Sequence, residues 1–186
     1  MKRRIIEVDY TEIGGFEASG LLTSEQVADY VRETIPTSHL EQCPSIQYEP
    51  DNPEFVSYPY GLAFFDPETH EIKVGPAERF GLIAPEQEMI DTVTHEIGHN
   101  AHQNLIEHRL EIAAKWADLY ERSKNGENDF VSRYASTNEY EDFAESYMTY
   151  VRDPGLLQFV SPEKYALMRD FIFAGREYPP REVGRE

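Results

Sequence analysis

The sequence has one cysteine, few basic residues and no long apolar run, and each of these scarcities excludes a class of protein. Cys43 is the only cysteine and cannot form an intramolecular disulfide, so nothing in the sequence points to an oxidising compartment. No apolar run approaches the roughly 20 residues that cross a bilayer, and Glu7 and Asp9 interrupt the apolar stretch of a secretory signal. We therefore expect a cytoplasmic protein without a membrane segment, unless another machine delivers it elsewhere.

Basic residues are half as frequent as acidic ones. The 17 Lys and Arg stand against 35 Asp and Glu, which gives a formal net charge of −18. Such an acidic chain repels phosphate backbones, so nucleic acid is a poor partner. A basic peptide or protein is favoured as partner, although a well-solvated acidic surface is the simpler explanation of the charge. The oligomeric state stays open.

Length and composition are those of one globular domain. The 186 residues are 40% apolar and include 12 Tyr and 10 Phe, enough for a core without disulfides. We expect a single α+β domain over residues 1–186, in which a small N-terminal mixed sheet precedes a mainly helical C-terminal half. Within it we distinguish an N-terminal segment of unassigned role (1–60), a core that carries the chemistry described below (61–175) and a loose tail (176–186).

Local patterns place the secondary structure along this chain. Residues 5–10 alternate as a strand does, and Thr23 and Gln26 are spaced like a capping box before a helix. Residues 36–60 contain five prolines and predict an irregular surface connection. Residues 61–75 predict a β-hairpin. Helical periodicity is found in 24–34, from Pro85 onward, near 106–123, over 138–152 with Pro154 ending it, and from Ser161 onward.

The chemistry is indicated by residues 95–99, which read His-Glu-Ile-Gly-His and fit the pattern H-E-x-x-H. Positions i and i+4 of a helix lie one above the other, about 6 Å apart. His95 and His99 can therefore converge on one zinc ion at about 2.0–2.1 Å. Glu96 flanks the metal instead of ligating it, and can take a proton from water held there. The alternative is a helix with two ordinary histidines.

A catalytic zinc site needs a third protein ligand and an open fourth position. The metzincin pattern puts that ligand six residues after His99, where this chain has Leu105. His102 is seven residues from His95, roughly 10 Å of helix rise, so a straight helix cannot bring both to one ion. We expect His102 to be a surface residue or a neighbour of the ligands.

The better candidate for the third ligand lies in the helix predicted over 138–152. Glu141 and Glu145 share one face along the edge of its apolar stripe, an unfavourable place for carboxylates without a cation. Glu141 would be the ligand, and Glu145 either accepts a hydrogen bond from a ligand histidine or is an exposed acid. Tyr134 precedes the helix and could reach a developing oxyanion. Glu139 is interpreted as a charge at the helix N-terminus.

Together, the two segments resemble a known family. The H-E-x-x-H motif combined with Tyr-x-x-Thr-Asn-Glu-x-Glu-x-Phe-Ala-Glu over residues 134–145 is similar to the catalytic domain of anthrax toxin lethal factor. It is more loosely similar to the bacterial Pro-Pro endopeptidases of the same zinc-peptidase clan. The resemblance covers roughly residues 61–175 and implies a zincin-like fold of the gluzincin type. The roles that it implies are zinc ligation by His95, His99 and Glu141, general base catalysis by Glu96 and oxyanion stabilisation by Tyr134.

The resemblance also implies a substrate-binding edge strand ahead of the active-site helix. The segment Glu71, Ile72, Lys73, Val74 and Gly75 matches that strand. In the loop that follows, Phe80, Leu82 and Ile83 either wall a side-chain pocket or, as we favour, make ordinary core contacts. The receptor-binding and translocation domains of the toxin do not fit in 186 residues, so its delivery and its substrates are not carried over.

These inferences predict a zinc-dependent endopeptidase with one Zn²⁺ per chain that hydrolyses an extended peptide or protein segment. The rival interpretation is a non-catalytic zinc-binding module that recognises a partner through the same scaffold. A structural zinc site fits less well, because such sites are usually closed and rich in cysteine. The natural substrate, its cleavage motif and the biological role are not predicted by the sequence.

Overall fold

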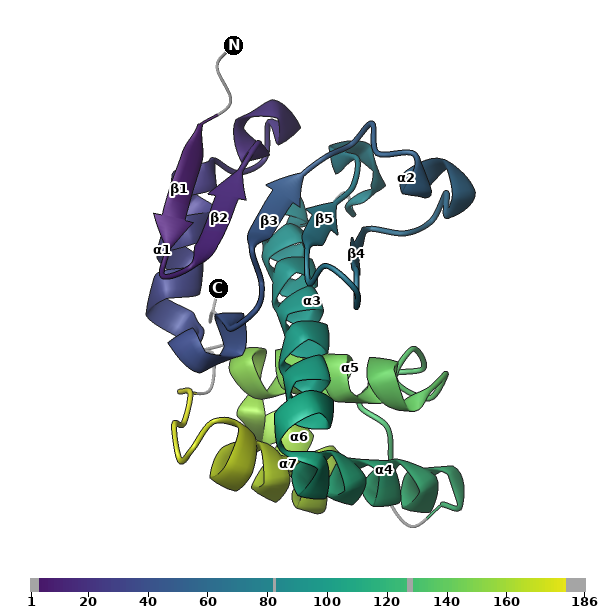
Figure 1. Cartoon of the computed structure of the whole chain (residues 1–186). Coiled ribbons are helices and arrows are strands. Elements are labelled where there is room, and N and C mark those ends of the chain that lie inside the picture. The colour runs from purple at the N-terminus through teal and green to yellow at the C-terminus, as the bar shows by residue number, and fades with distance from the viewer. Residues whose placement is uncertain (1–3, 82, 127–128, 180–186) are drawn as a thin grey trace. The chain divides into compact units, whose positions relative to one another are not determined.

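A computed structural model describes residues 4–81, 83–126 and 129–179 (Figure 1). In this part of the chain a five-stranded mixed sheet and seven α-helices are present, which confirms the predicted α+β class. Contacts group the chain into two compact units, one up to Ala101 and one from His102 onward. The boundary falls inside the long helix α3 (Pro85–His108). The single-domain assignment stays a prediction.

The sheet belongs to the first unit. Its strands are β1 (Ile5–Val8), β2 (Thr11–Gly14), β3 (Ser45–Tyr48), β4 (Ala63–Phe65) and β5 (Ile72–Val74). They lie in the order β1-β2-β3-β5-β4, with antiparallel pairs at the two ends and parallel pairs in the middle. The predicted hairpin is confirmed as β4 and β5, and residues up to 60 supply the other three strands.

The prediction of an irregular connection over residues 36–60 is wrong. This segment contains a 3-10 turn (Thr37–Leu40), strand β3 and a short helix α2 (Glu54–Ser57). Two of its prolines stand next to elements and not inside them: Pro44 precedes β3, and Pro53 is the N-cap of α2. Ile46 of β3 is fully buried. A strand of four residues is too short to show a clear alternation of apolar and polar residues, and the prolines around it indicate a loop.

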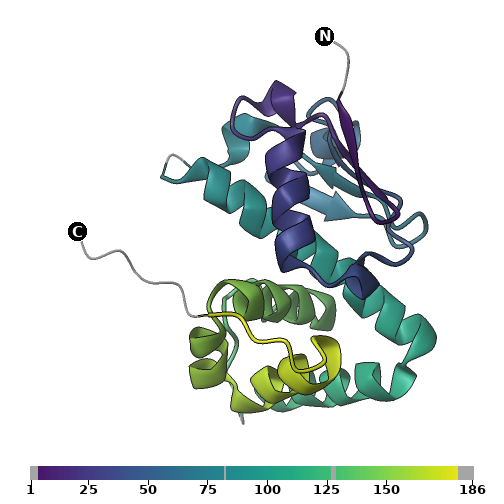
Figure 2. The same ribbon diagram turned by 90° about the vertical axis from the view of Figure 1, so that its left-hand side faces the viewer.

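Helices α1 (Ser24–Thr34) and α3 lie on the same face of this sheet (Figures 1 and 2). The predicted capping box starts α1, since Thr23 Oγ1 accepts from the Gln26 amide at 3.2 Å and Gln26 Oε1 accepts from the Thr23 amide at 2.8 Å. The core between helices and sheet is apolar and fully buried. It includes Ile13, Val27, Val31, Ile46, Ile72, Met89, Val93 and Ile97.

The second unit is helical over the residues described. It contains α4 (Leu110–Lys124), α5 (Glu139–Arg152), α6 (Pro154–Val160), α7 (Pro162–Leu167) and a π-helical turn (Met168–Ile172). Helix α4 starts four residues later than the 106 expected, because α3 continues to His108. Pro154 does follow the end of α5, but it also opens α6, which the sequence did not predict.

The prediction of a loose tail over residues 176–186 is wrong for its first residues, which contact other parts of the second unit. The Tyr150 hydroxyl donates to the Arg176 carbonyl at 2.7 Å, and the Tyr178 ring contacts those of Tyr150 and Phe173. The remainder of the predicted tail, residues 180–186, lies outside the described residues. Among the helices that the structure describes, none combines the length and the apolar character needed to cross a membrane.

Candidate metal centre

Helix α3 carries the two histidines of the motif. Pro85 is its first residue, and Glu86 and Glu88 lie in its first turn. The positive end of the helix dipole stabilises carboxylates at this position. The rings of His95 and His99 have centroids 4.8 Å apart and are nearly perpendicular. The i and i+4 spacing therefore places both imidazoles on one side of the helix, as predicted.

Helix α5 carries the third residue. The Asn138 side chain accepts a hydrogen bond from the Glu141 amide at 3.0 Å and thereby caps the helix. This cap fixes Glu141 in the first turn of α5. The apolar residues of the helix are buried, and they include Phe143, Ala144, Tyr147, Tyr150 and Val151.

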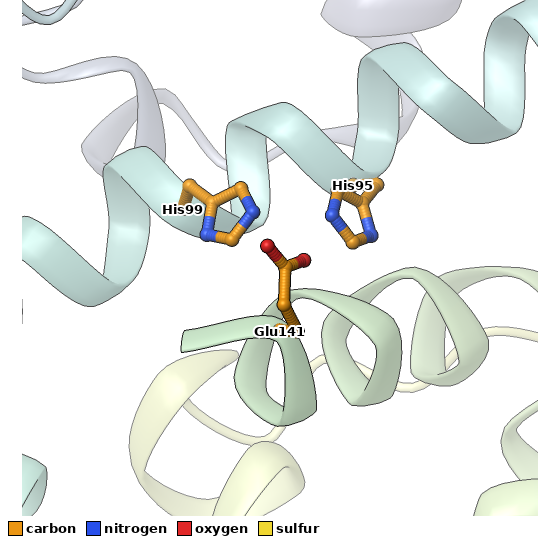
Figure 3. A group of neighbouring side chains, drawn as sticks. All are labelled: His95, His99 and Glu141. Atoms are coloured by element: carbon orange, nitrogen blue, oxygen red, sulfur yellow. The ribbon is translucent and has the colours of Figure 1, made fainter. Parts of the chain in front are cut away.

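His95, His99 and Glu141 form one group of potential metal ligands. Each offers one ligand atom, and these atoms lie within 4.8 Å of one another. Figure 3 shows the Glu141 carboxylate directed toward both imidazole rings. Ligand atoms of a tetrahedral ion at 2.0–2.1 Å are separated by about 3.4 Å, which lies within the 4.8 Å limit of this group. The donor set thus fits a metal ion, and this group could hold one.

Glu96 directly follows the first histidine of the group and is 6% exposed. Burial of a carboxylate is unfavourable unless other groups compensate it. Glu96 is therefore not one of the solvated acids that give the chain its net charge. Its position on α3, next to a ligand candidate but outside the ligand group, agrees with the position that the motif predicts for it.

Tyr134 and Glu145 lie on either side of Glu141 in the sequence. Tyr134 is 54% exposed, and its carbonyl accepts hydrogen bonds from the amide and hydroxyl of Thr137 at 3.0 and 2.7 Å. Glu145 accepts from Ser132 Oγ at 2.6 Å, and Ser132 Oγ accepts from the Ala135 amide. These bonds tie the turn before α5 to the helix. The roles expected of Tyr134 and Glu145 at the metal stay predictions.

His102 is a core residue and not a surface residue. Its ring is fully buried and stacks on Phe143, with centroids 4.4 Å apart and planes 4° from parallel. Its Nε2 lies 3.6 Å from Glu139 Oε1, and burial raises the pKa of the Glu139 carboxyl. Glu139 is in the first turn of α5, as predicted, but His102 is a contact that the sequence did not indicate.

The expectation that Glu71–Gly75 is an edge strand is wrong. Strand β5 pairs with β3 on one side and with β4 on the other, so hydrogen bonds are used along both of its sides. The edge position was implied by the resemblance alone, and β3, which pairs with β5, lies in the proline-rich segment where no strand was predicted. The edge strands of the described sheet are β1 and β4. The ring of Phe65, the last residue of β4, stacks on His99 with centroids 6.3 Å apart.

The loop before α3 contains the residues considered for a side-chain pocket. Phe80 is buried, which confirms the core contact favoured for it. Ile83 is 91% exposed, so the core contact favoured for it is wrong. Leu82 lies outside the described residues.

Comparison of the chain with protein-family models, with curated proteins and with solved structures gave no match. The likeness to the lethal factor catalytic domain thus rests on the residues of the two motifs.

Proposed function

We propose that this chain is a zinc-dependent endopeptidase with a zincin-like fold of the gluzincin type. The observation that carries the proposal is the convergence of His95 and His99 with Glu141, which follows 42 residues later in the chain. Two imidazoles and one carboxylate are a ligand set of catalytic zinc sites, which keep one position open. Structural zinc sites are usually closed and cysteine-rich, and the only cysteine here, Cys43, is buried elsewhere in the first unit.

Three further residues of the two motifs, Glu96, Tyr134 and Glu145, have a role in this proposal. Bound zinc lowers the pKa of water toward about 7 and polarises a peptide carbonyl. Glu96 accepts the proton of the attacking water and returns it to the leaving amine. The phenol of Tyr134 donates a hydrogen bond to the oxyanion that develops on the carbonyl. Glu145 supports a ligand histidine by accepting its second ring proton.

The substrate in this proposal is an extended peptide that adds to the free side of β4. Strand β4 is last in the order of the described sheet, and β5 occupies only one of its sides. A peptide can add there as an antiparallel strand through main-chain hydrogen bonds. The net charge of −18 favours basic residues around the scissile bond, an effect that salt weakens.

A peptide library read by mass spectrometry tests this function. We expect the zinc-loaded protein to cut a subset of peptides, enriched in basic residues around the cut. Cleavage should stop when a chelator removes the metal and return when zinc is restored. A protein that binds zinc but cuts no peptide would favour the non-catalytic partner-recognition module.

The third ligand is tested by Glu141→Ala. Losing an outer partner of a metal ligand typically lowers metal affinity by about 10–100-fold, so loss of a ligand itself should lower zinc affinity by more than about 100-fold. Glu139→Ala is the matched control, because Glu139 lies in the same turn of α5 and carries the same charge. Zinc affinity is measured by competition with a chelating dye. Equal affinities of the two variants would place the third ligand elsewhere.

A further inference from the structure

Asn100, the residue after His99, makes a set of hydrogen bonds that fixes how its side chain is oriented. It is fully buried, and its Nδ2 donates to the carbonyls of His39 and Glu41 at 2.9 and 3.0 Å. Its Oδ1 lies 2.7 Å from Nδ1 of His70. Both amide protons face carbonyl acceptors, so Oδ1 must be the acceptor and Nδ1 of His70 the donor. The contact defines the tautomer of His70.

His70 is held in an uncommon conformation at the turn between β4 and β5. Its φ of 58° lies in the left-handed region, which few residues other than glycine adopt. The His70 amide donates to the Asp66 carbonyl at 2.7 Å, and Asp66 Oδ1 accepts from the Glu68 and Thr69 amides. Because this conformation is unfavourable, a residue keeps it only where surrounding contacts hold it there. In this turn they hold the imidazole in a buried position, from which it reaches Asn100.

Phe65 links this turn to the metal ligand. Its ring makes an edge contact with His70, with centroids 5.5 Å apart and planes at 90°. The same ring stacks on His99, with centroids 6.3 Å apart and planes at 17°. Phe65 therefore contacts both imidazoles: that of His70, which Asn100 holds, and that of His99, which belongs to the ligand group.

We propose that His70 is a positioning residue for the metal centre. By donating to Asn100 it fixes the β4–β5 turn on helix α3, and Phe65 then holds the His99 ring in the orientation that ligation requires. His70 acts through Phe65, which packs against the ligand candidate His99, and it touches neither metal nor substrate. The proposal rests on the proposed function, because it presumes that His99 binds a metal.

The experiment compares variants of the full chain that separate the hydrogen bond from the ring. His70→Phe keeps an aromatic ring and removes the donor. His70→Asn removes the ring but keeps an N–H donor near the position of Nδ1, and Asn tolerates positive φ. His108→Phe is the control, because His108 is an exposed histidine at the end of α3. Zinc affinity and the visible absorption of bound Co²⁺ are measured for each.

We expect His70→Phe to lower zinc affinity by about tenfold, the lower end of the effect of outer partners, and to change the Co²⁺ spectrum. His70→Asn should recover most of the affinity, and His108→Phe should match the wild type. Phe65→Leu tests the same link without touching the turn, and should also change the spectrum. Wild-type spectra and affinities for both His70→Phe and Phe65→Leu would overturn the proposal. A wild-type protein that binds neither ion would instead contradict the proposed function.

Discussion

Glu96→Gln is expected to abolish peptide cleavage while zinc stays bound. Glutamine has the shape of glutamate but no basic oxygen, so it cannot accept the proton of the attacking water. General base catalysis typically contributes about 10²–10⁴-fold to a rate, and we expect a loss of this size in kcat/KM. Zinc should stay bound because Glu96 lies outside the group formed by His95, His99 and Glu141.

The measurement pairs cleavage of a peptide selected from the library with the zinc content of the same preparation. Glu86→Gln is the matched control: it makes the same charge change on the same helix, at an exposed position of the first turn. We expect this control to cleave like the wild type. Wild-type cleavage by Glu96→Gln would contradict the role of Glu96 as the base. Loss of zinc together with cleavage would show that Glu96 shapes the metal site.

The parts of the candidate site that were predictable depend on local spacing. The period of a helix places His95 and His99 on one side of α3, whatever the rest of the fold does. Glu141 was predictable for a second reason: a carboxylate beside an apolar stripe is unfavourable unless a cation compensates its charge. The structure groups its carboxylate with the two histidines. In both cases the information lies within a few residues of one helix.

The parts that were not predictable depend on pairing between distant segments. Strand β3 is four residues long, and its neighbours β2 and β5 pair with it from more than 25 positions away. Without β3 the position of β5 inside the sheet, and of β4 at its edge, cannot be inferred. The same holds for the hydrogen bond from His70 to Asn100, which joins a turn to a helix 30 residues later.

Lys164→Met is expected to be strongly destabilising, because it breaks a buried ion pair between two helices of the second unit. Lys164 Nζ lies 2.7 Å from Asp142 Oδ1, and both side chains are fully buried. The Lys164 ammonium also lies over the ring of Phe130, 4.6 Å from its centroid. Burial raises the pKa of Asp142 to about 6 and lowers that of Lys164, because both charged forms lose their hydration.

Removal of one partner leaves the other charge buried without compensation, which typically costs 3–5 kcal/mol. We therefore expect Lys164→Met to lower the free energy of unfolding by about 3–5 kcal/mol in urea denaturation. Arg122→Met is the control: it removes an ion pair with Glu163 whose side chains are 33% and 49% exposed, and should cost about 1 kcal/mol or less. Equal effects of the two variants would show that burial does not govern the pair.

The double variant Asp142→Leu/Lys164→Met separates two possible roles of this pair. Replacing a whole buried ion pair by apolar residues is often neutral or stabilising, so the double variant should recover most of the stability lost in Lys164→Met. Asp142 directly follows Glu141 on α5. If the pair also fixes the placement of that helix turn, the double variant will regain stability and still bind zinc more weakly than the wild type. Full recovery of both would restrict the pair to a role in packing.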